Sequence, residues 1–593
     1  MDLFRVFYHQ LMKSIALIWP QAYQSGDLGA VQVEQPRDSK FGDLSTNAAL
    51  IIGKKLRLPP IEVANKLIQH IKTYDDVAAV EVVAPGFLNC RLHEQSWRQV
   101  LHHIIKSDMN YGDSQIGQGQ HINVEYVSAN PTGPLHLAHA RGAVVGDALA
   151  SLLLKAGYHV TKEYYINDAG AQVDVLANSS YLRYQEALGV DIGEIPSGYY
   201  PGEYLKDVGA AIAKKDGRRW LNQSPKDWVP VFRQYAVQMM MQNIKTDLLE
   251  LGIKHDLFSS EKALIDTGGV DQAIAELEKM GLIYTGILEA PKGTKAPEDW
   301  EPRPQMLFRS TSFGDDVDRP LRKSDGSWTY FATDIAYQFS KFRRGDKVLI
   351  NVWGADHAGY VKRLQAAVAA ITANQARFEA RICQMVRLLR DGQPVKMSKR
   401  AGTFVTLREV MDEVGRDVVR FIMLTRKNDA PLDFDLTKVI DQSRDNPVYY
   451  VQYAHARTCS VWRRLKKDFP QLLIDERDLP KAQFNRLTDE AEMTLIKMLG
   501  TWPKVVESAA QAQEPHRIAY YLYEVAHLFH VLYTKGKGKD ESNLRFIVPE
   551  QTDVTLARLA LVHSVGIVIR CGLKIMGVEP VTEMQYESST TSL

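Results

Sequence analysis

The chain has 593 residues, a net charge of +1 at pH 7, 45% hydrophobic residues and 24% charged residues. This length predicts several domains, and the balanced composition excludes a disordered or collagen-like chain. The near-zero net charge excludes a basic character of the whole surface, so any nucleic-acid contact must be local. We find no apolar run of the roughly 18 residues that a membrane span needs, and we expect no membrane partner.

The four cysteines stand far apart in the sequence, at positions 90, 383, 459 and 571, and no CxxC pair occurs. We therefore expect neither a structural zinc site nor a disulfide framework. This use of cysteine fits a reducing compartment, and we expect a cytoplasmic protein.

Residues 1–115 are predicted to form a small α/β module. It includes a helix over residues 46–56 that ends before Pro59 and Pro60. A strand pair follows over residues 80–83 and 87–92, with a turn at Pro85 and Gly86.

Residues 116–410 are predicted to contain a parallel sheet. A strand over residues 122–128 leads into a turn rich in glycine and proline, then a helix over residues 136–156 and a strand over residues 160–166. Strand, helix, strand is a βαβ unit, which predicts the α/β class with a parallel sheet. Residues 190–300 are polar and turn-rich, which indicates an insertion.

Residues 411–593 are predicted to form an all-α C-terminal domain. Apolar residues recur at helical spacing from about residue 410 to Met576, while the final residues are polar. We expect those final residues to form a tail.

Two histidines, His136 and His139, stand where the predicted strand gives way to the predicted helix. Residues three apart share one face of a helical turn. A helix N-terminus offers free N–H groups to a phosphate, and two imidazoles there can donate hydrogen bonds as phosphate charge grows in a transition state. Alone, such a pair more often indicates surface histidines, and a zinc pair is disfavoured because no third ligand lies nearby.

A second basic motif covers residues 395–403, which read Val-Lys-Met-Ser-Lys-Arg-Ala-Gly-Thr. Lys396 and Lys399 can neutralise a departing pyrophosphate. Alone, such a segment is usually a solvated basic turn. The chain contains no P-loop motif, so a nucleotide would need another cradle.

A HxxH motif after the first predicted strand and a KMSK motif after the last are the signature of class I aminoacyl-tRNA synthetases, and the chain resembles this class. The residues around the motifs resemble the bacterial arginyl-tRNA synthetases, at segments 128–136, 140–147, 165–170, 321–326, 333–336 and 354–357. Segments 41–47 and 86–89 resemble the family's additional N-terminal domain. Segments 417–421 and 446–457 resemble its anticodon-binding domain.

The resemblance implies three domains. Residues 1–115 would form the additional domain that contacts the corner of the tRNA. Residues 116–410 would form a Rossmann-like catalytic domain with an insertion near residues 190–300, and residues 411–593 the helical anticodon-binding domain. We expect a monomer.

The resemblance also implies the reaction. ATP, with Mg²⁺, would activate arginine as arginyl-adenylate and release pyrophosphate, and arginine would pass to the 3′ end of its tRNA. Family members need tRNA for ATP–pyrophosphate exchange, and we expect the same here. The implied catalytic residues are His136, His139, Lys396 and Lys399, and the implied ATP-binding residues add Gly354, Asp356, His357, Met397 and Ser398.

The arginine-contacting positions of the family fall on Glu125, Asn130, Tyr330 and Asp334. A guanidinium binds a carboxylate with paired hydrogen bonds, and Glu125 and Asp334 can each supply one. The alternative for Asp334 is an ordinary acid in the first turn of a helix.

The tRNA-contacting positions implied by the resemblance are Asn446, Tyr449, Tyr450 and Tyr453. Tyrosines stack on unpaired bases, at ~1–3 kcal/mol each. Tyr449 and Tyr453 are also spaced as in the buried stripe of a helix, so we expect at least one of them in the core.

Two positions depart from the family's pattern. The third residue of the HxxH motif is usually glycine, because adenine packs against it, and here it is Ala138. Some family members carry glutamine where His357 stands.

Three alternatives share part of this pattern. A cysteinyl-tRNA synthetase would show a Cys/His zinc cluster, which this chain lacks. A nucleotidylyltransferase also uses a HxxH motif but is much shorter. A paralogue that only binds tRNA would not need intact histidine and KMSK motifs.

Overall fold

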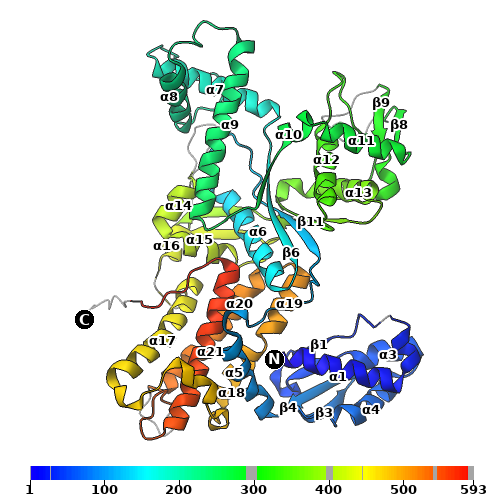
Figure 1. Ribbon diagram of the computed structural model, residues 1–593, viewed down its shortest axis with the longest axis vertical. Coiled ribbons are helices and arrows are strands. Elements are labelled where there is room, and N and C mark those ends of the chain that lie inside the picture. The colour runs from blue at the N-terminus through cyan, green and yellow to red at the C-terminus, as the bar shows by residue number, and fades with distance from the viewer. Residues whose placement is uncertain are drawn as a thin grey trace.

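The computed structural model describes residues 2–26, 28–288, 303–395, 405–441, 443, 445–537 and 544–584. Figure 1 shows an N-terminal module, in blue, beside the C-terminal helices, in yellow to red. A central sheet lies above both and carries two outer lobes.

The N-terminal module packs helices on one antiparallel sheet of strand order β1-β2-β4-β3. Its strands are β1 (Val33–Glu34), β2 (Leu44–Thr46), β3 (Val77–Val83) and β4 (Phe87–Leu92). Its helices are α1 (Leu3–Ile18), α2 (Pro20–Gln24), α3 (Ala48–Leu56) and α4 (Pro60–Ile71), and α5 (Glu94–Ser107) leads out of the module. The expected helix and strand pair are present.

The central sheet is parallel throughout and has the strand order β12-β11-β5-β6-β7. Its strands are β5 (His121–Glu125), β6 (His159–Ile166), β7 (Leu257–Ser260), β11 (Val348–Gly354) and β12 (Arg377–Cys383). Helices α6 (Leu137–Lys155), α12 (Tyr330–Arg343) and α13 (Val361–Ile371) connect and cover it. This confirms the predicted α/β class. The strand order reverses between β5 and β11, and open α/β sheets bind ligands at such a point.

One lobe consists of three helices, α7 (Ala171–Ala187), α8 (Tyr204–Asp216) and α9 (Pro225–Glu250), around an apolar cluster of their own. The other lobe contains α10 (Glu261–Asp266), α11 (Gly269–Lys279) and a small antiparallel sheet, β8 (Ile283–Gly286), β9 (Gln305–Phe308) and β10 (Arg319–Pro320). We expected one insertion near residues 190–300. Instead, β7 lies inside that range as the edge strand of the central sheet, so the range is not one insertion.

A second small sheet follows the central one, with strands β13 (Val386–Arg390), β14 (Gln393–Pro394) and β15 (Leu432–Asp435). The same stretch of chain contains helices α14 (Leu407–Val414), α15 (Arg416–Met423) and α16 (Leu436–Val439), and α16 packs against β13 and β15. β15 pairs in parallel with β13. This strand lies beyond residue 411, where we expected helices alone. A strand of four residues is too short for its alternation of apolar and polar residues to be recognised in the sequence.

The C-terminal bundle contains α17 (Pro447–Asp468), α18 (Glu490–Gly500), α19 (Trp502–Ala512), α20 (His516–Lys535) and α21 (Thr552–Met576). By length and composition alone, α6 and α21 are apolar enough to cross a membrane. However, 72% of the apolar window of α6 and 83% of that of α21 are buried inside the protein, as in core helices.

Arg420 joins helix α6 beside the central sheet to the C-terminal bundle. This buried side chain donates hydrogen bonds to Asp147 Oδ2 in α6 at 2.6 Å, to the Leu251 carbonyl at 3.0 Å and to the Met576 carbonyl at 2.7 Å. Burial raises the pKa of Asp147, but the charges of Arg420 and Lys162 outweigh it and hold that pKa below its usual value. The helix that begins at the signature histidines is thereby fixed to the end of α21.

Candidate active site

A strained turn leads from β5 to the signature motif. Val127 and Ser128 have φ angles of 70° and 38°, values that side chains with a Cβ rarely adopt. The Ser128 hydroxyl donates to Glu125 Oε1 at 3.1 Å and accepts the Tyr165 N–H at 3.0 Å. Such strain persists where surrounding contacts impose it, and it clusters at functional sites.

The two signature histidines lie together at the start of α6. His136 is the residue before the helix, and its N–H donates to Nδ1 of His139 at 3.2 Å. The centroids of the two imidazole rings are 3.8 Å apart. Thr406 pairs with His136 in a β-bridge, and the Leu407 N–H donates to the Leu135 carbonyl at 2.8 Å.

Four of the predicted residues, Lys396, Met397, Ser398 and Lys399, lie outside the described residues. Because Thr406 follows them closely in the chain, the bridge ties the region after the second motif to the first motif.

The other predicted ATP-binding residues, Gly354, Asp356 and His357, lie at the carboxyl end of β11, beside β5 in the sheet. His357 Nε2 is 3.5 Å from Asp356 Oδ2, and both side chains are exposed. Ala138 is exposed on the first turn of α6. These residues are open to a ligand at the point where the strand order reverses.

Tyr330 and Asp334 lie on one face of the first turns of α12. Tyr330 is exposed, whereas the Asp334 carboxylate accepts a hydrogen bond from the Tyr360 hydroxyl at 2.5 Å. Burial and the neighbouring charges of Glu261 and Glu125 raise the pKa of Asp334 to about 7. Asn130 is separate from this pair and donates to the side chain of Gln172 at 2.7 Å.

Glu125 is already paired with a cation of the protein. Its Oε2 accepts hydrogen bonds from Lys341 Nζ at 2.6 Å and from Asn351 Nδ2 at 2.9 Å. The Lys341 side chain is completely buried. We expected an open carboxylate here, but the sequence did not reveal this buried lysine.

Glu261, which we did not single out from the sequence, is a buried carboxyl group beside this site. Its Oε2 has no hydrogen-bond partner among the described residues. Burial and the charge of Asp168 raise its pKa to about 7. The buried Tyr165 hydroxyl likewise has no hydrogen-bond partner in the part of the chain that the structure describes, and burial together with the charges of Glu261 and Asp334 raises its pKa. An acid directly after a strand at the carboxyl edge of the sheet is the signal that could have revealed Glu261.

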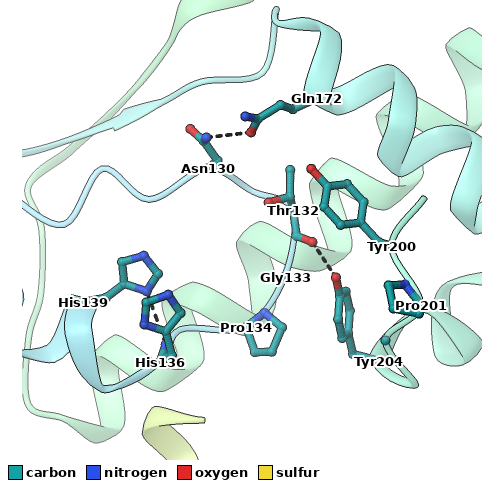
Figure 2. A pocket seen from close by; sticks show the side chains of 11 residues that line it. Asn130, Thr132, Gly133, Pro134, His136, His139, Gln172, Tyr200, Pro201 and Tyr204 are labelled. Atoms are coloured by element: carbon teal, nitrogen blue, oxygen red, sulfur yellow. Dashed lines mark hydrogen bonds between the residues drawn. The ribbon is translucent and has the colours of Figure 1, made fainter. Parts of the chain in front are cut away.

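A cavity of about 360 Å³ opens beside the signature turn (Figure 2). It is lined by Asn130, Thr132, Gly133, Pro134, His136, His139, Gln172, Tyr200, Pro201, Gly202 and Tyr204. Among the described residues, no group of three or more His, Cys, Asp and Glu side chains is arranged to hold a metal ion.

Comparison with known proteins identifies the family. The chain matches the family model for the class I arginyl-tRNA synthetase catalytic domain over residues 100–460. It also matches the arginyl-tRNA synthetase N-terminal domain over residues 9–92 and the DALR anticodon-binding domain over residues 451–584.

Relatives that match the chain over its full length indicate the same family. The chain is 54% identical to the arginine–tRNA ligase of Parvibaculum lavamentivorans, with 99% of this chain and 100% of the relative covered. It is 52% identical to that of Azorhizobium caulinodans, with the same coverage. The chain belongs to the arginyl-tRNA synthetase family.

The fold also matches an arginyl-tRNA synthetase from Thermus thermophilus, with a TM-score of 0.74 at 19% identity over 98% of this chain and 100% of that one. Members of this family act on ATP and tRNA, and the DALR region of this chain is the helical bundle that contains α17, α20 and α21.

The synthetase has a second cavity, of about 410 Å³, in its DALR region. Tyr449, Tyr450 and Tyr453 line it from α17, together with Arg457, and His527, His530, Val531, Thr534 and Lys535 line it from α20. Arg457 donates to His530 Nδ1 at 2.8 Å and lies 4.2 Å from the centre of the Tyr453 ring. Neither Arg457 nor His530 is among the residues predicted from the sequence.

Two of the predicted tRNA contacts are buried. Tyr449 is 9% exposed, which agrees with our expectation that one tyrosine of this stripe belongs to the core. Asn446 caps α17 and donates to the carbonyls of Val439 and Asp441, both at 2.8 Å. The amide of Asn446 is thus engaged within the protein.

Proposed function

We propose that this chain activates arginine with ATP and transfers it to the 3′ end of its tRNA, with the guanidinium bound by Asp334 and Glu261. The observation that carries the assignment is the pair of carboxyl groups beside Tyr165, the buried Glu261 and the half-buried Asp334, whose pKa values are raised to about 7. Carboxyl groups that resist ionisation in an empty site gain most from a bound cation. A guanidinium presents five N–H donors, which suit two carboxylates and a tyrosine hydroxyl.

The chemistry proceeds in two steps. A carboxylate oxygen of arginine attacks the α-phosphorus of ATP, and the bond from that phosphorus to the bridging oxygen of pyrophosphate breaks. His136 and His139 donate hydrogen bonds to the phosphates, and Lys396 and Lys399 neutralise the departing pyrophosphate. Magnesium enters as a complex with ATP. A hydroxyl of the terminal adenosine then attacks the arginyl carbonyl, and AMP leaves.

The remaining assignments concern the whole chain. The N-terminal module contacts the corner of the tRNA, and the cavity of α17 and α20 receives an anticodon base against its tyrosines. The protein acts as a monomer in the cytoplasm.

An aminoacylation screen tests the proposal. The chain is given total tRNA, ATP with Mg²⁺ and each of the twenty amino acids in turn, and arginine alone is expected to be charged efficiently. Asp334→Asn and Glu261→Gln should each lower kcat/KM for arginine by about 10² or more, because a buried charge partner is lost. Asp271→Asn, on the exposed face of α11, is the matched control and should be neutral. Efficient charging of another amino acid would refute the assignment.

A further inference from the structure

The first turn of α14 is attached to the signature motif. Thr406 precedes this helix and pairs with His136 in a β-bridge. The Leu407 N–H donates to the Leu135 carbonyl at 2.8 Å, and the Leu407 side chain is buried. Thr406 also caps the helix, because its hydroxyl accepts the Glu409 N–H at 3.1 Å and its own N–H donates to Glu409 Oε2 at 2.7 Å. The position of the His136 backbone therefore depends on the position of this turn.

Arg408, in the same turn, ties α14 to the end of α9, and Figure 1 shows α14 beside the lower end of α9. Arg408 donates to Asp247 Oδ1 at 2.8 Å and also pairs with Glu250, and both acids belong to the last turn of α9. Asp247 is buried. Burial raises the pKa of Asp247, and the hydrogen bond from Arg408 opposes that rise. Arg408 thus balances a buried carboxylate, and the loss of one partner of such a pair is costly.

The end of α9 is itself fixed in place. Arg420 of α15, a buried side chain, donates to the Leu251 carbonyl, directly after α9, at 3.0 Å. Elsewhere along its length, α9 packs against α7 and α8 in the helical lobe. Asp247 is therefore presented to Arg408 from a well-anchored helix. The roles assigned so far use neither Arg408 nor Asp247.

The position of His136 also sets the orientation of His139. The His136 N–H donates to Nδ1 of His139 at 3.2 Å. A neutral imidazole that accepts at Nδ1 carries its proton on Nε2. A shift of the His136 backbone would therefore turn the ring that presents this proton. A displacement of about 1 Å in an active site can lower a rate by ~10².

We propose that Arg408 is a positioning residue for adenylate formation. Paired with Asp247, it holds the start of α14 against the signature motif, and so it keeps His136 and His139 in the orientation that the transition state needs. Arg408 lines neither of the two cavities described above, so it acts through the His136 backbone and not on a substrate. The proposal rests on the proposed function, which assigns the phosphates of ATP to these histidines.

Single-turnover adenylate formation by the full chain tests this role, with arginine and tRNA saturating and ATP varied. Arg408→Met keeps the apolar stem and should lower the rate at saturating ATP by about 10², while the ATP concentration that gives half of the maximal rate stays nearly unchanged. Arg408→Lys keeps a cation for Asp247 and should recover most of the rate.

Arg387→Met is the matched control. Arg387 of β13 also forms an ion pair, with hydrogen bonds of 2.6 and 2.9 Å to Asp433, but that pair is exposed and does not involve α14 or α9. This variant should form adenylate at the wild-type rate.

A double-mutant cycle identifies the partner of Arg408. Asp247→Asn alone should also lower the rate, and Asp247→Asn combined with Arg408→Met should lower it no further than Arg408→Met does. If the two losses multiply, Arg408 does not act through Asp247, and the proposal is wrong.

A purely structural role gives a different result. Arg408→Met would then lower the unfolding temperature and the fraction of active sites, but each remaining site would form adenylate at the wild-type rate, which would overturn the proposal. If Arg408→Met does not fold, Asp247→Asn decides, because an unchanged rate per active site in that variant also overturns it. Failure of the wild type to charge arginine would overturn the proposed function, and a wild type that charges normally separates the two failures.

Discussion

The ammonium of Lys341 lies 2.6 Å from Oε2 of Glu125, and both side chains are buried. Asn351 donates to the same oxygen at 2.9 Å. The carboxylate at the end of β5 is therefore neutralised by the protein itself, whereas Glu261 Oε2 has no hydrogen-bond partner among the described residues. A buried ion pair adds little net stability, but breaking one partner is costly.

We predict that Lys341→Met lowers the free energy of unfolding by about 3–5 kcal/mol, because Glu125 would be left as an uncompensated buried charge. Denaturant unfolding of the two proteins measures the difference. The double variant Lys341→Met with Glu125→Gln should recover much of the loss. Lys347→Met, at an exposed position, is the control and should change little. An equal loss in the double and single variants would mean that packing, and not charge, is responsible.

We predict that KM for arginine rises as pH falls below 7. Asp334 and Glu261 have pKa values of about 7 in the arginine-free protein, so at lower pH a proton must leave before the guanidinium can pair. Each such carboxyl group raises KM for arginine by up to about tenfold for each pH unit below its pKa. KM measured from pH 5.5 to 8 with ATP and tRNA saturating should show this slope, and Asp334→Asn should reduce it to the contribution of Glu261. A constant KM across that range would contradict the prediction.

Asp334 and Glu261 also determine how the free energy of unfolding changes with pH. Their pKa values are about 7 in the folded protein, above the ordinary values of 3.8 and 4.5. The folded state therefore binds more protons between pH 4 and 7, and their contribution to stability is lost as pH rises through that window. Saturating arginine should remove this loss, which thermal unfolding at pH 5 and pH 8 with and without arginine will show.

The fold could be predicted from the sequence where a regular pattern of apolar residues extended over many residues. The helix expected over residues 136–156 is α6, which runs from Leu137 to Lys155, and its flanking strands define the parallel sheet. β7 and β15 were missed because each has four residues, too few for an apolar alternation to stand out. Tertiary pairing, and not the local sequence, makes those segments strands.

The site could be predicted only in part. The signature histidines stand next to each other, and local chain geometry is enough to bring them together. Lys341 lies 216 residues after Glu125 in the chain, and only the folded sheet shows that Lys341 and Glu261 are buried. Burial gives Glu261 its raised pKa, and only its position directly after β7 could have pointed to it from the sequence.

We predict that Arg457→Ala raises KM for tRNA by about tenfold. Arg457 packs on Tyr453 and bonds to His530 at the wall of the second cavity, so its loss removes a cation and loosens the stacking surface. Arg464→Ala is the matched control, because Arg464 is an exposed arginine of the same helix that does not line the cavity.

The comparison of these two arginines separates a base site from general attraction. If tRNA is held there only by charge, both variants should lose the same affinity, and the loss should vanish at high salt. We expect Arg457→Ala to lose more affinity for tRNA than Arg464→Ala does, and this loss should not depend on salt.

We predict that Lys399→Ala slows adenylate formation by ~10²–10³, about 2.7–4 kcal/mol, with nearly unchanged affinity for ATP. As the bond to the α-phosphorus breaks, negative charge grows on the pyrophosphate oxygens, and an ammonium placed there gains more in the transition state than in the ground state. Such an interaction raises kcat, whereas binding that is equal in both states lowers KM. Single-turnover adenylate formation with tRNA and ATP saturating measures the rate.

The alternative for Lys399 is an exposed basic turn that only attracts tRNA. Under that alternative Lys399→Ala would form adenylate at a near wild-type rate, and its defect would appear in KM for tRNA and fade as salt rises. Thr406, bridged to His136, places the chain just after this motif beside the two signature histidines. That bridge favours the catalytic role, because it brings the chain that follows the second motif to the first motif. A near wild-type single-turnover rate would remove Lys399 from the catalytic residues.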